Sequence, residues 1–204
     1  MVLAMFVDGD QLPLLSALAG GSVFVTPSIL SPDERPPFRG NPTSEFARGL
    51  YAAQQDLGQV RYALRAYRRS AFYQGDFWRP LELTRLELEL ARYLASREAR
   101  EQARKLNPQF KAKSVSVADA ECAAVSIRRG FELWSDDGGI VTLVRTLFPQ
   151  QPVVRLCALL ARAVNEDQLD FETALDVYER VFKGELLLWS TVNLAQVDGV
   201  ALCR

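Results

Sequence analysis

Residues 119–141 have the sequence DAECAAVSIRRGFELWSDDGGIV, and this stretch decides the fold that the chain is expected to adopt. It begins inside an alanine-rich helix predicted over 117–129, which starts after the cap residue Ser116, with Asp119 three residues on, and stops at Gly130. A short strand over 131–135 follows, then two aspartates and two glycines that open another helix. A helix leading into a strand that ends in acidic residues is typical of an α/β protein.

The N-terminal part of the chain has the same alternation. Residues 2–7 and 22–26 are short apolar runs typical of buried strands, and a helix is expected between them over 10–19. Further helices and a last strand are expected at 43–56, 58–73, from Pro80 to about 106, 152–165, 170–183 and 185–191. The sequence therefore predicts a mostly parallel sheet with helices on its faces, interrupted by a helical insertion.

Charge divides the chain into three blocks. Residues 1–34 carry a formal charge of −4, residues 35–113 carry +8, and residues 114–204 carry −5, which together give the net charge of −1. We expect an α/β domain made of 1–34 and 114–204, with 35–113 as a basic helical arm. Such asymmetry favours carboxylates gathered for a metal and a basic surface for a polyanion, although helices that simply differ in charge are an alternative.

The chain has no histidine, which excludes Ser-His-Asp and Cys-His catalysis and zinc sites that need histidine ligands. Three widely spaced cysteines predict reduced thiols in a cytoplasmic protein. The longest apolar run is far below the roughly 18 residues that a membrane span needs. No basic region precedes the N-terminal apolar run, so no secretory signal is predicted.

Carboxylates follow three of the expected strands. Asp8 and Asp10 follow the first strand, Glu34 follows the second, and Asp136 and Asp137 follow the strand at 131–135. Because the carboxyl ends of parallel strands meet at one edge of a sheet, these acids are expected to converge there. The alternative for any single aspartate, including Asp136 or Asp137, is that it only caps the next helix.

Glu121 is expected on a buried, alanine-rich face of its helix. A buried carboxylate needs a partner, and either Arg128 or a metal ion is a candidate. Oxygen ligands without histidine or paired cysteine suit Mg²⁺ or Mn²⁺. Such an ion commonly serves phosphate chemistry by polarising the phosphoryl group and activating water.

These motifs resemble those of the PIN-domain nucleases. AMFVDGDQLPLLSAL resembles their first strand with its acid at Asp8, and VFVTPSILSPDE resembles the second strand and the helix whose acid falls at Glu34. The stretch quoted first resembles the later block, with its acids at Glu121 and Asp137 and an additional acid at Asp136. PVVRLCALLARAVNEDQLDFETALDVYERV resembles the two closing helices of a bacterial subgroup.

The resemblance implies a three-layer α/β/α fold and a metal-dependent endoribonuclease that cuts RNA phosphodiesters with water activated by Mg²⁺ or Mn²⁺. It implies catalytic and metal-binding roles for Asp8, Glu34, Glu121 and Asp137, with Asp136 as a further metal ligand. The bacterial subgroup acts as the toxin of a toxin–antitoxin pair, so an antitoxin or another protein partner, and a homodimer, are further expectations. The helical segment 43–106 lies outside the resemblance.

The expected RNA-binding residues are Arg61, Arg65, Arg68 and Arg69, which form one stripe on a helix and are interleaved with aromatic residues. Arginine binds phosphate in a bidentate manner, and aromatic rings stack on unpaired bases. A solvated helix face is the alternative for this stripe.

Two other functions are compatible with the sequence. One is a non-catalytic PIN-like module that binds nucleic acid or a partner protein. The other is a phosphatase of the haloacid dehalogenase type, because Asp8-x-Asp10 after a strand imitates its motif.

Overall fold

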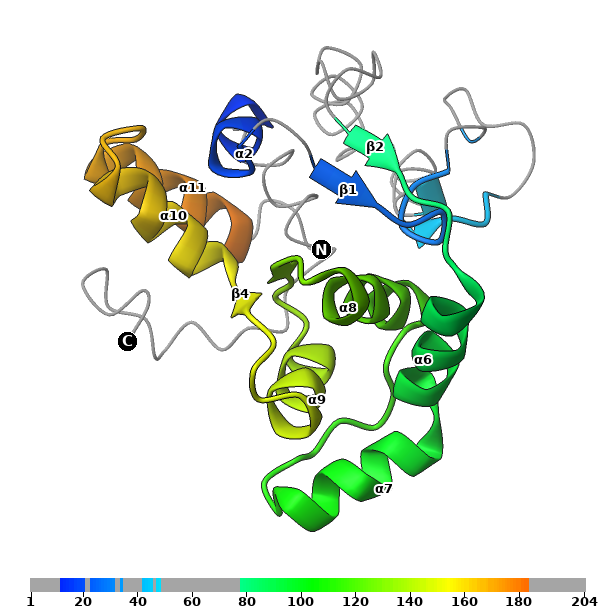
Figure 1. Ribbon diagram of the computed structural model, residues 1–204. Helices are drawn as coiled ribbons and strands as arrows, with labels where there is room; N and C mark the ends of the chain where they lie inside the picture. The colour runs from blue at the N-terminus through cyan, green and yellow to red at the C-terminus, as the bar shows by residue number, and fades with distance from the viewer. Residues whose placement is uncertain are drawn as a thin grey trace. The chain divides into compact units, whose positions relative to one another are not determined.

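The computed structural model describes residues 12–20, 23–31, 34, 42–45, 47–48 and 78–183. These residues belong to two compact units (Figure 1). The first contains the described parts of Val25–Ala47 and Pro80–Val154. The second contains the described parts of Val2–Phe24, Arg48–Arg79 and Arg155–Arg204.

Helix α8 (Val117–Arg129) is the central element of the first unit and has the bounds that the sequence predicts. Ser116 caps its first turn by accepting a hydrogen bond from the backbone N–H of Asp119. Gly130 ends it in the left-handed conformation, with φ of 71°, which costs glycine little because it has no Cβ. Alanines at 120, 123 and 124 are fully buried, so neighbouring elements can approach the helix closely.

Two helices, α6 (Arg85–Ala95) and α7 (Arg97–Leu106), replace the single long helix predicted from Pro80. Residues 78–80 instead form strand β2, and α6 begins after Thr84, whose side chain and that of Glu87 form a capping box. Ser96 separates the helices: its backbone is extended (φ −74°, ψ 162°), and its side chain accepts a hydrogen bond from Ala99 N–H at the start of α7.

Strands β3 (Leu133–Trp134) and β4 (Val153–Val154) form a small parallel sheet, and helix α9 (Gly138–Leu147) connects them. Leu133 pairs with Val153, and Trp134 pairs with Val154. The sequence predicted a helix already at residue 152, whereas residues 153–154 form this strand. The parallel pairing sends the chain that follows β3, with Asp136 and Asp137, off the carboxyl end of the sheet.

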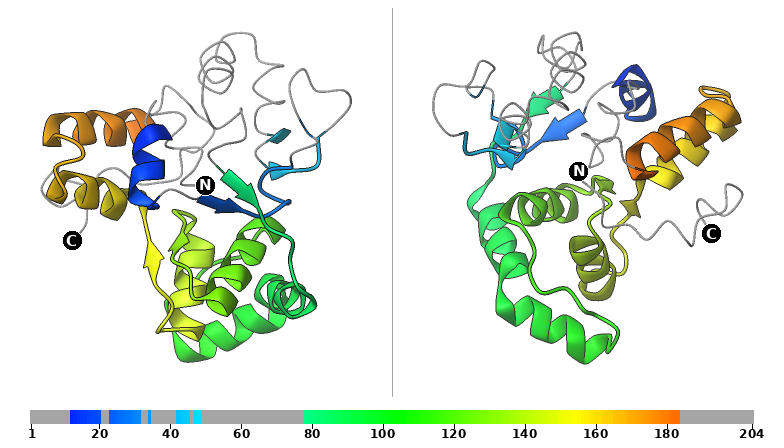
Figure 2. Two further views of the ribbon diagram at one scale, coloured as in Figure 1. Left: turned by 45° about the horizontal axis from the view of Figure 1, so that its top comes forward. Right: turned by 180° about the vertical axis from the view of Figure 1, so that it is seen from behind.

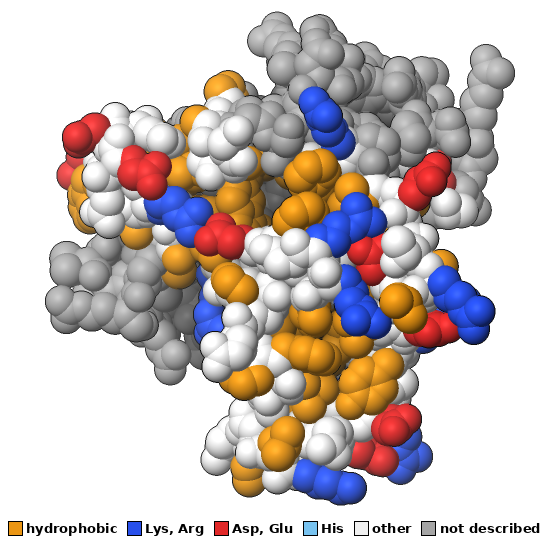
Figure 3. Space-filling view, in the orientation of Figure 1, with side chains coloured by type: hydrophobic (Ala, Val, Ile, Leu, Met, Phe, Trp, Pro, Cys, Tyr) orange, Lys and Arg blue, Asp and Glu red, His pale blue; other side chains and the backbone are white. Residues whose placement is uncertain are grey.

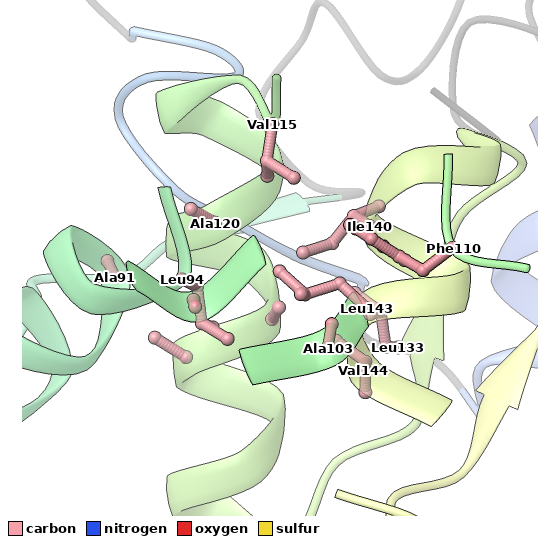
Figure 4. Packing of buried hydrophobic residues seen from close by; sticks show 13 residues of the cluster. Ala91, Leu94, Ala103, Phe110, Val115, Ala120, Leu133, Ile140, Leu143 and Val144 are labelled. Carbon is pink, nitrogen blue, oxygen red and sulfur yellow. The ribbon is translucent and has the colours of Figure 1, made fainter. Parts of the chain in front are cut away.

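One hydrophobic core holds the first unit together. Figure 4 shows Leu94 of α6, Ala103 of α7, Ala120 of α8 and Leu143 of α9 among the residues that meet there. Helix α6 packs along α8, and α7 packs against α9. Helices α6 and α7, which the sequence assigns to the basic arm, therefore share a core with the elements after residue 114. The division of the domain at residues 34 and 113 stays a prediction.

The second unit contains α2 (Leu12–Leu18), α10 (Leu156–Asn165) and α11 (Phe171–Lys183) (Figure 2). Helix α10 contacts both α2 and α11. Its leucines at 156, 159 and 160 are buried. The bounds of α10 and α11 agree with the predicted helices to within a few residues, apart from the residues that form β4.

A second two-stranded sheet pairs β1 (Val23–Val25) with β2 (Trp78–Pro80). The backbone N–H of Leu81 continues the pairing by donating to the carbonyl oxygen of Val25 (3.0 Å). The strand predicted over 22–26 is therefore confirmed. The elements predicted at 2–7, 58–73 and 185–191 lie outside the described residues.

The described residues thus form a mixed helical and strand structure with a small parallel sheet, as the sequence predicts at this coarse level. None of the helices in this part of the chain combines the length and the apolar character that a segment crossing a bilayer requires.

Candidate functional site

Asp119 and Asp137 are two carboxylates at helix starts: Asp119 lies in the first turn of α8, and Asp137 lies between the carboxyl end of β3 and the start of α9. Asp119 is buried, with only 7% of its surface exposed. Burial raises the pKa of its carboxyl group, a hydrogen bond from Ser116 opposes the rise, and the negative charge of Asp137 adds to it. The segment that leads into α8 also packs beside Asp137: a Cβ atom built on Gly139 would lie 3.0 Å from Oδ1 of Asp137 and 3.3 Å from the carbonyl oxygen of Ser114.

The hydroxyl of Ser116 orients Asp119. It donates to Oδ2 of Asp119 over 2.7 Å and accepts from the backbone N–H of Asp119 over 3.0 Å. This reciprocal pair fixes the side chain on the first turn of the helix. The sequence showed the pair only as a helix cap, so the role of Asp119 at the site was missed.

Asp137 caps α9, as the simpler interpretation of this aspartate predicts. Its Oδ1 accepts hydrogen bonds from the backbone N–H groups of Gly139 (2.8 Å) and Ile140 (3.0 Å). Its own backbone N–H donates to the hydroxyl of Ser135 (3.2 Å). Among the described residues no hydrogen bond uses Oδ2 of Asp137, so one carboxylate oxygen of this exposed residue is available to a ligand. Asp136, beside it, is buried.

Glu121 is buried on α8, with 9% of its surface exposed. Its Oε2 has no hydrogen-bond partner within the described part of the chain. Arg128, the candidate salt-bridge partner, is exposed, and it is the next residue, Arg129, that forms an ion pair, with Glu87 on α6. A buried carboxylate oxygen without a partner is costly, which leaves an acceptor on this helix that a ligand can satisfy.

Glu34 is engaged with the backbone and hydroxyl groups of two neighbouring residues. Oε1 accepts from the backbone N–H and, over 2.6 Å, from the hydroxyl of Thr43. Oε2 accepts from the backbone N–H (2.8 Å) and hydroxyl (2.5 Å) of Ser44. Burial alone would raise the pKa of Glu34, but these bonds outweigh it and lower the pKa to about 2. Glu34 is thus an ionised carboxylate that ties residue 34 to residues 43–44.

The described residues do not bring three or more acidic or cysteine side chains together at one point where a metal ion could bind. Glu34, Glu121, Asp136 and Asp137 are all described, and no three of them gather at one point. A site that Asp8 completes stays a prediction, because Asp8 lies outside the described residues. Asp10, on which the phosphatase interpretation depends, lies outside them too. The same holds for the predicted RNA-binding residues Arg61, Arg65, Arg68 and Arg69.

The thiol of Cys122 adds no nucleophile to the site. Burial raises its pKa, while its contact with the hydroxyl of Thr26, at 3.6 Å between Sγ and Oγ1, only partly opposes the rise. A thiol with a raised pKa stays protonated near neutral pH and is a poor nucleophile. The chemistry available to the described site is therefore that of carboxylates.

Comparison with known proteins gives no family for this chain: no protein-family model matches it, and neither a curated protein nor a solved structure shows significant similarity to it.

Proposed function

We propose that this protein is a metal-dependent endoribonuclease of the PIN type, with a three-layer α/β/α fold. The observation that carries the proposal is that Asp137 follows a parallel strand at its carboxyl end, while Ser114, in the segment that leads into α8 and to Asp119, packs beside Gly139 at the start of α9. Sites in open parallel sheets form at this end of the strands. The absence of histidine from the whole sequence is compatible with a site that uses carboxylates alone.

The donor groups fit a hard divalent cation. Mg²⁺ is commonly held in proteins by one or two carboxylates, with water and substrate phosphates completing its coordination. Asp119 and Asp137 would supply these two carboxylates, and a cation would relieve the repulsion between them. When bound, such an ion supplies charge neutralisation and water activation at a phosphodiester.

The residues of the chain prepare this site in a fixed geometry. Ser116 holds the carboxylate of Asp119 on the first turn of α8. The N–H groups of Gly139 and Ile140 hold Oδ1 of Asp137. Because each carboxylate is bound to a rigid helix end, little reorganisation is needed when a cation or a phosphate arrives.

The proposed metal-binding set also includes Asp8, Glu34, Glu121 and Asp136. The orphan Oε2 of Glu121 supports its inclusion. The hydrogen bonds of Glu34 to Thr43 and Ser44 favour a structural contribution from this residue. An RNA substrate, an antitoxin or another protein partner, and a homodimer remain part of the proposal, as does a cytoplasmic location.

The experiment is cleavage of a panel of single-stranded and structured RNAs by the full chain with Mn²⁺ or Mg²⁺. Asp119→Asn and Asp137→Asn are each expected to abolish cleavage while RNA binding persists. Asparagine is a good helix cap, so Asp137→Asn keeps α9 in place. The matched control is Glu98→Gln, an exposed residue of α7, which should cleave as the wild type does. Full cleavage by both aspartate variants would remove the proposal.

A non-catalytic PIN-like module that binds nucleic acid or a partner protein is the second candidate. The observation that favours it is that Asp137 and Glu34 already have structural tasks, as a helix cap and as a bridge to residues 43–44. RNA binding by the wild type without any cleavage in Mn²⁺ would select this candidate.

A further inference from the structure

The last turn of α7 and the segment between α7 and α8 carry a run of positive charge. Residues 102–118 contain four basic residues and no acidic one. All four side chains are exposed, and no ion pair to a described residue neutralises them. We call these residues the basic strip: Arg104, Lys105, Lys111 and Lys113. On α6, by contrast, Arg85 pairs with Glu89, and Figure 3 shows basic and acidic side chains side by side over this helix.

The strip lies next to the carboxylates of the candidate site. A Cβ atom built on Gly139 would lie 3.0 Å from Oδ1 of Asp137, and 3.3 Å from both the Cβ of Ala112 and the carbonyl oxygen of Ser114. Residues 112 and 114 and the carboxylate of Asp137 therefore all lie around this glycine. Lys111 and Lys113 flank Ala112 in the chain, so the backbone that carries both lysines runs close to Asp137.

The segment that carries the lysines is held firmly. Phe110 before it and Val115 after it are buried in the core of the first unit (Figure 4). Arg104 of α7 donates a hydrogen bond from Nη2 to the carbonyl oxygen of Ala112 (3.2 Å). The backbone between the two anchors is thus tied to α7, and the two exposed lysines have a defined position.

We propose that the basic strip binds the phosphate backbone of a single-stranded RNA and delivers it to the Asp119–Asp137 site, an inference that rests on the proposed nuclease function. Two carboxylates repel a polyanion, and positive charge beside them reduces this repulsion. Lys111 and Lys113 supply this charge as point contacts to phosphates, and the guanidinium of Arg104 extends the strip onto α7. Phosphate contacts hold a strand in register without reading its sequence.

The test measures binding and cleavage separately. The double variant Lys111→Gln/Lys113→Gln is compared with the wild type by fluorescence anisotropy, using a short labelled single-stranded RNA in EDTA, so that no metal is involved. Binding should weaken by roughly tenfold at low salt, and to a similar degree for different RNA sequences. Between about 50 and 200 mM salt, the slope of log affinity against log salt should fall by about 1.4, which corresponds to two phosphates of a single strand.

The matched control is Arg85→Gln/Arg128→Gln, which removes the same charge from the opposite end of the unit. The Glu87–Arg129 ion pair holds the first turn of α6, with Arg85, beside the last turn of α8, with Arg128. Asp119 lies in the first turn of α8, and the helix is roughly 18 Å long, so the control positions are far from Asp119. This control should bind RNA as the wild type does. Equal loss in both double variants would show a general charge effect and overturn the inference.

Each outcome separates the inference from the proposed function. If the lysine variant binds RNA as the wild type does, the basic strip is not the RNA site, whatever the cleavage assay shows. If lysine-dependent RNA binding is found without cleavage in Mn²⁺, the inference stands and the nuclease proposal fails. If poly-glutamate binds the wild type more tightly than RNA does, the strip is a site for an acidic protein, and the inference is overturned.

Discussion

Arg129 and Glu87 form a two-point ion pair that joins the last turn of α8 to the first turn of α6. Nε of Arg129 lies 2.6 Å from Oε1 of Glu87, and Nη2 lies 3.0 Å from Oε2. The same Nη2 also donates to the carbonyl oxygen of Glu82 (2.9 Å). Glu87 is almost fully buried, whereas Arg129 is partly exposed. The pair therefore satisfies a carboxylate that could not stay charged in the core without it.

Removal of the arginine is expected to destabilise the first unit strongly. Arg129→Ala leaves the buried carboxylate of Glu87 without its cation, which should lower the free energy of unfolding by about 3 kcal/mol. Urea unfolding followed by circular dichroism measures the change. Arg128→Ala, at the exposed neighbouring position, is the control and should stay within about 0.5 kcal/mol of the wild type. Equal effects of the two substitutions would mean that the ion pair contributes little.

Acid is expected to weaken the fold through the same residue. The bond from Arg129 lowers the pKa of Glu87 to about 2, which outweighs the opposite effect of burial; the hydrogen bonds from Thr84 assist. The ordinary pKa is 4.5, so the unfolded chain takes up the proton first. The stabilisation is complete above about pH 4.5 and is lost as the pH falls toward about 2.

Glu87→Gln separates this contribution from that of other acids. Glu34 has a pKa lowered to about 2 as well, through Ser44 and Thr43, so the wild type should lose stability at both positions on acidification. Urea titrations between about pH 5 and pH 3 should give a shallower loss of unfolding free energy for Glu87→Gln than for the wild type. Parallel pH curves for the two proteins would contradict the assignment.

The two glycines that open α9 are expected to respond oppositely to alanine. At Gly139 a methyl group would lie 3.0 Å from Oδ1 of Asp137 and 3.3 Å from the carbonyl oxygen of Ser114, so Gly139→Ala should cost about 1–3 kcal/mol. At Gly138 a methyl group would meet no described atom within 4 Å, and Gly138→Ala should stabilise by about 0.4–1 kcal/mol. Thermal unfolding of both variants measures the difference, and equal midpoints would show that the packing at Gly139 is loose.

Local signals made much of the first unit predictable. The sequence predicts that α8 begins after Ser116 and ends at Gly130, and the structure has the same limits. These limits are predictable because a helix cap and a left-handed glycine each depend only on residues a few positions away. The start of the long helix predicted from Pro80, and its continuity across Ser96, were wrong for a related reason, whereas its end near residue 106 agrees with the end of α7. Thr84 and Ser96 are caps too, but the continuous helix-forming sequence around them concealed their effect.

Features that depend on distant residues were harder to predict. Val153 and Val154 form a strand because Leu133 and Trp134 offer a parallel partner, and nothing in the local sequence distinguishes them from the helix that follows. Asp119 was assigned only to the cap with Ser116, whereas its position beside Asp137 depends on how α8 packs against the β3–α9 connection. The sequence therefore named Asp137 and Glu121 as candidate site residues, and their role stays a prediction, whereas the packing of α8 against the β3–α9 connection could not be predicted from it.

Asp119 is expected to reduce stability at neutral pH. Burial raises the pKa of its carboxyl group, the hydroxyl of Ser116 opposes the rise, and the charge of Asp137 adds to it. The ordinary pKa of an aspartate, which applies to the unfolded chain, is 3.8. Because the pKa of Asp119 is higher in the folded protein, protonation of this carboxyl group stabilises the fold fully below pH 3.8, and the stabilisation is lost as the pH rises through the pKa of the folded protein. Asp119→Asn keeps an acceptor for Ser116 and removes the charge, so it should raise the melting temperature at pH 7.

This gain should shrink in acid and in the presence of a divalent cation. Below the ordinary pKa the wild-type carboxyl is protonated in both states, so the two proteins should melt alike. Mn²⁺ should raise the melting temperature of the wild type more than that of Asp119→Asn, because a bound ion stabilises the folded protein in proportion to its affinity. Differential scanning fluorimetry across pH, with and without Mn²⁺, measures both effects, with Glu98→Gln as the control. A wild type that melts above Asp119→Asn at pH 7 without metal would show that the carboxylate is paired, and it would remove the physical basis for a cation beside Asp137.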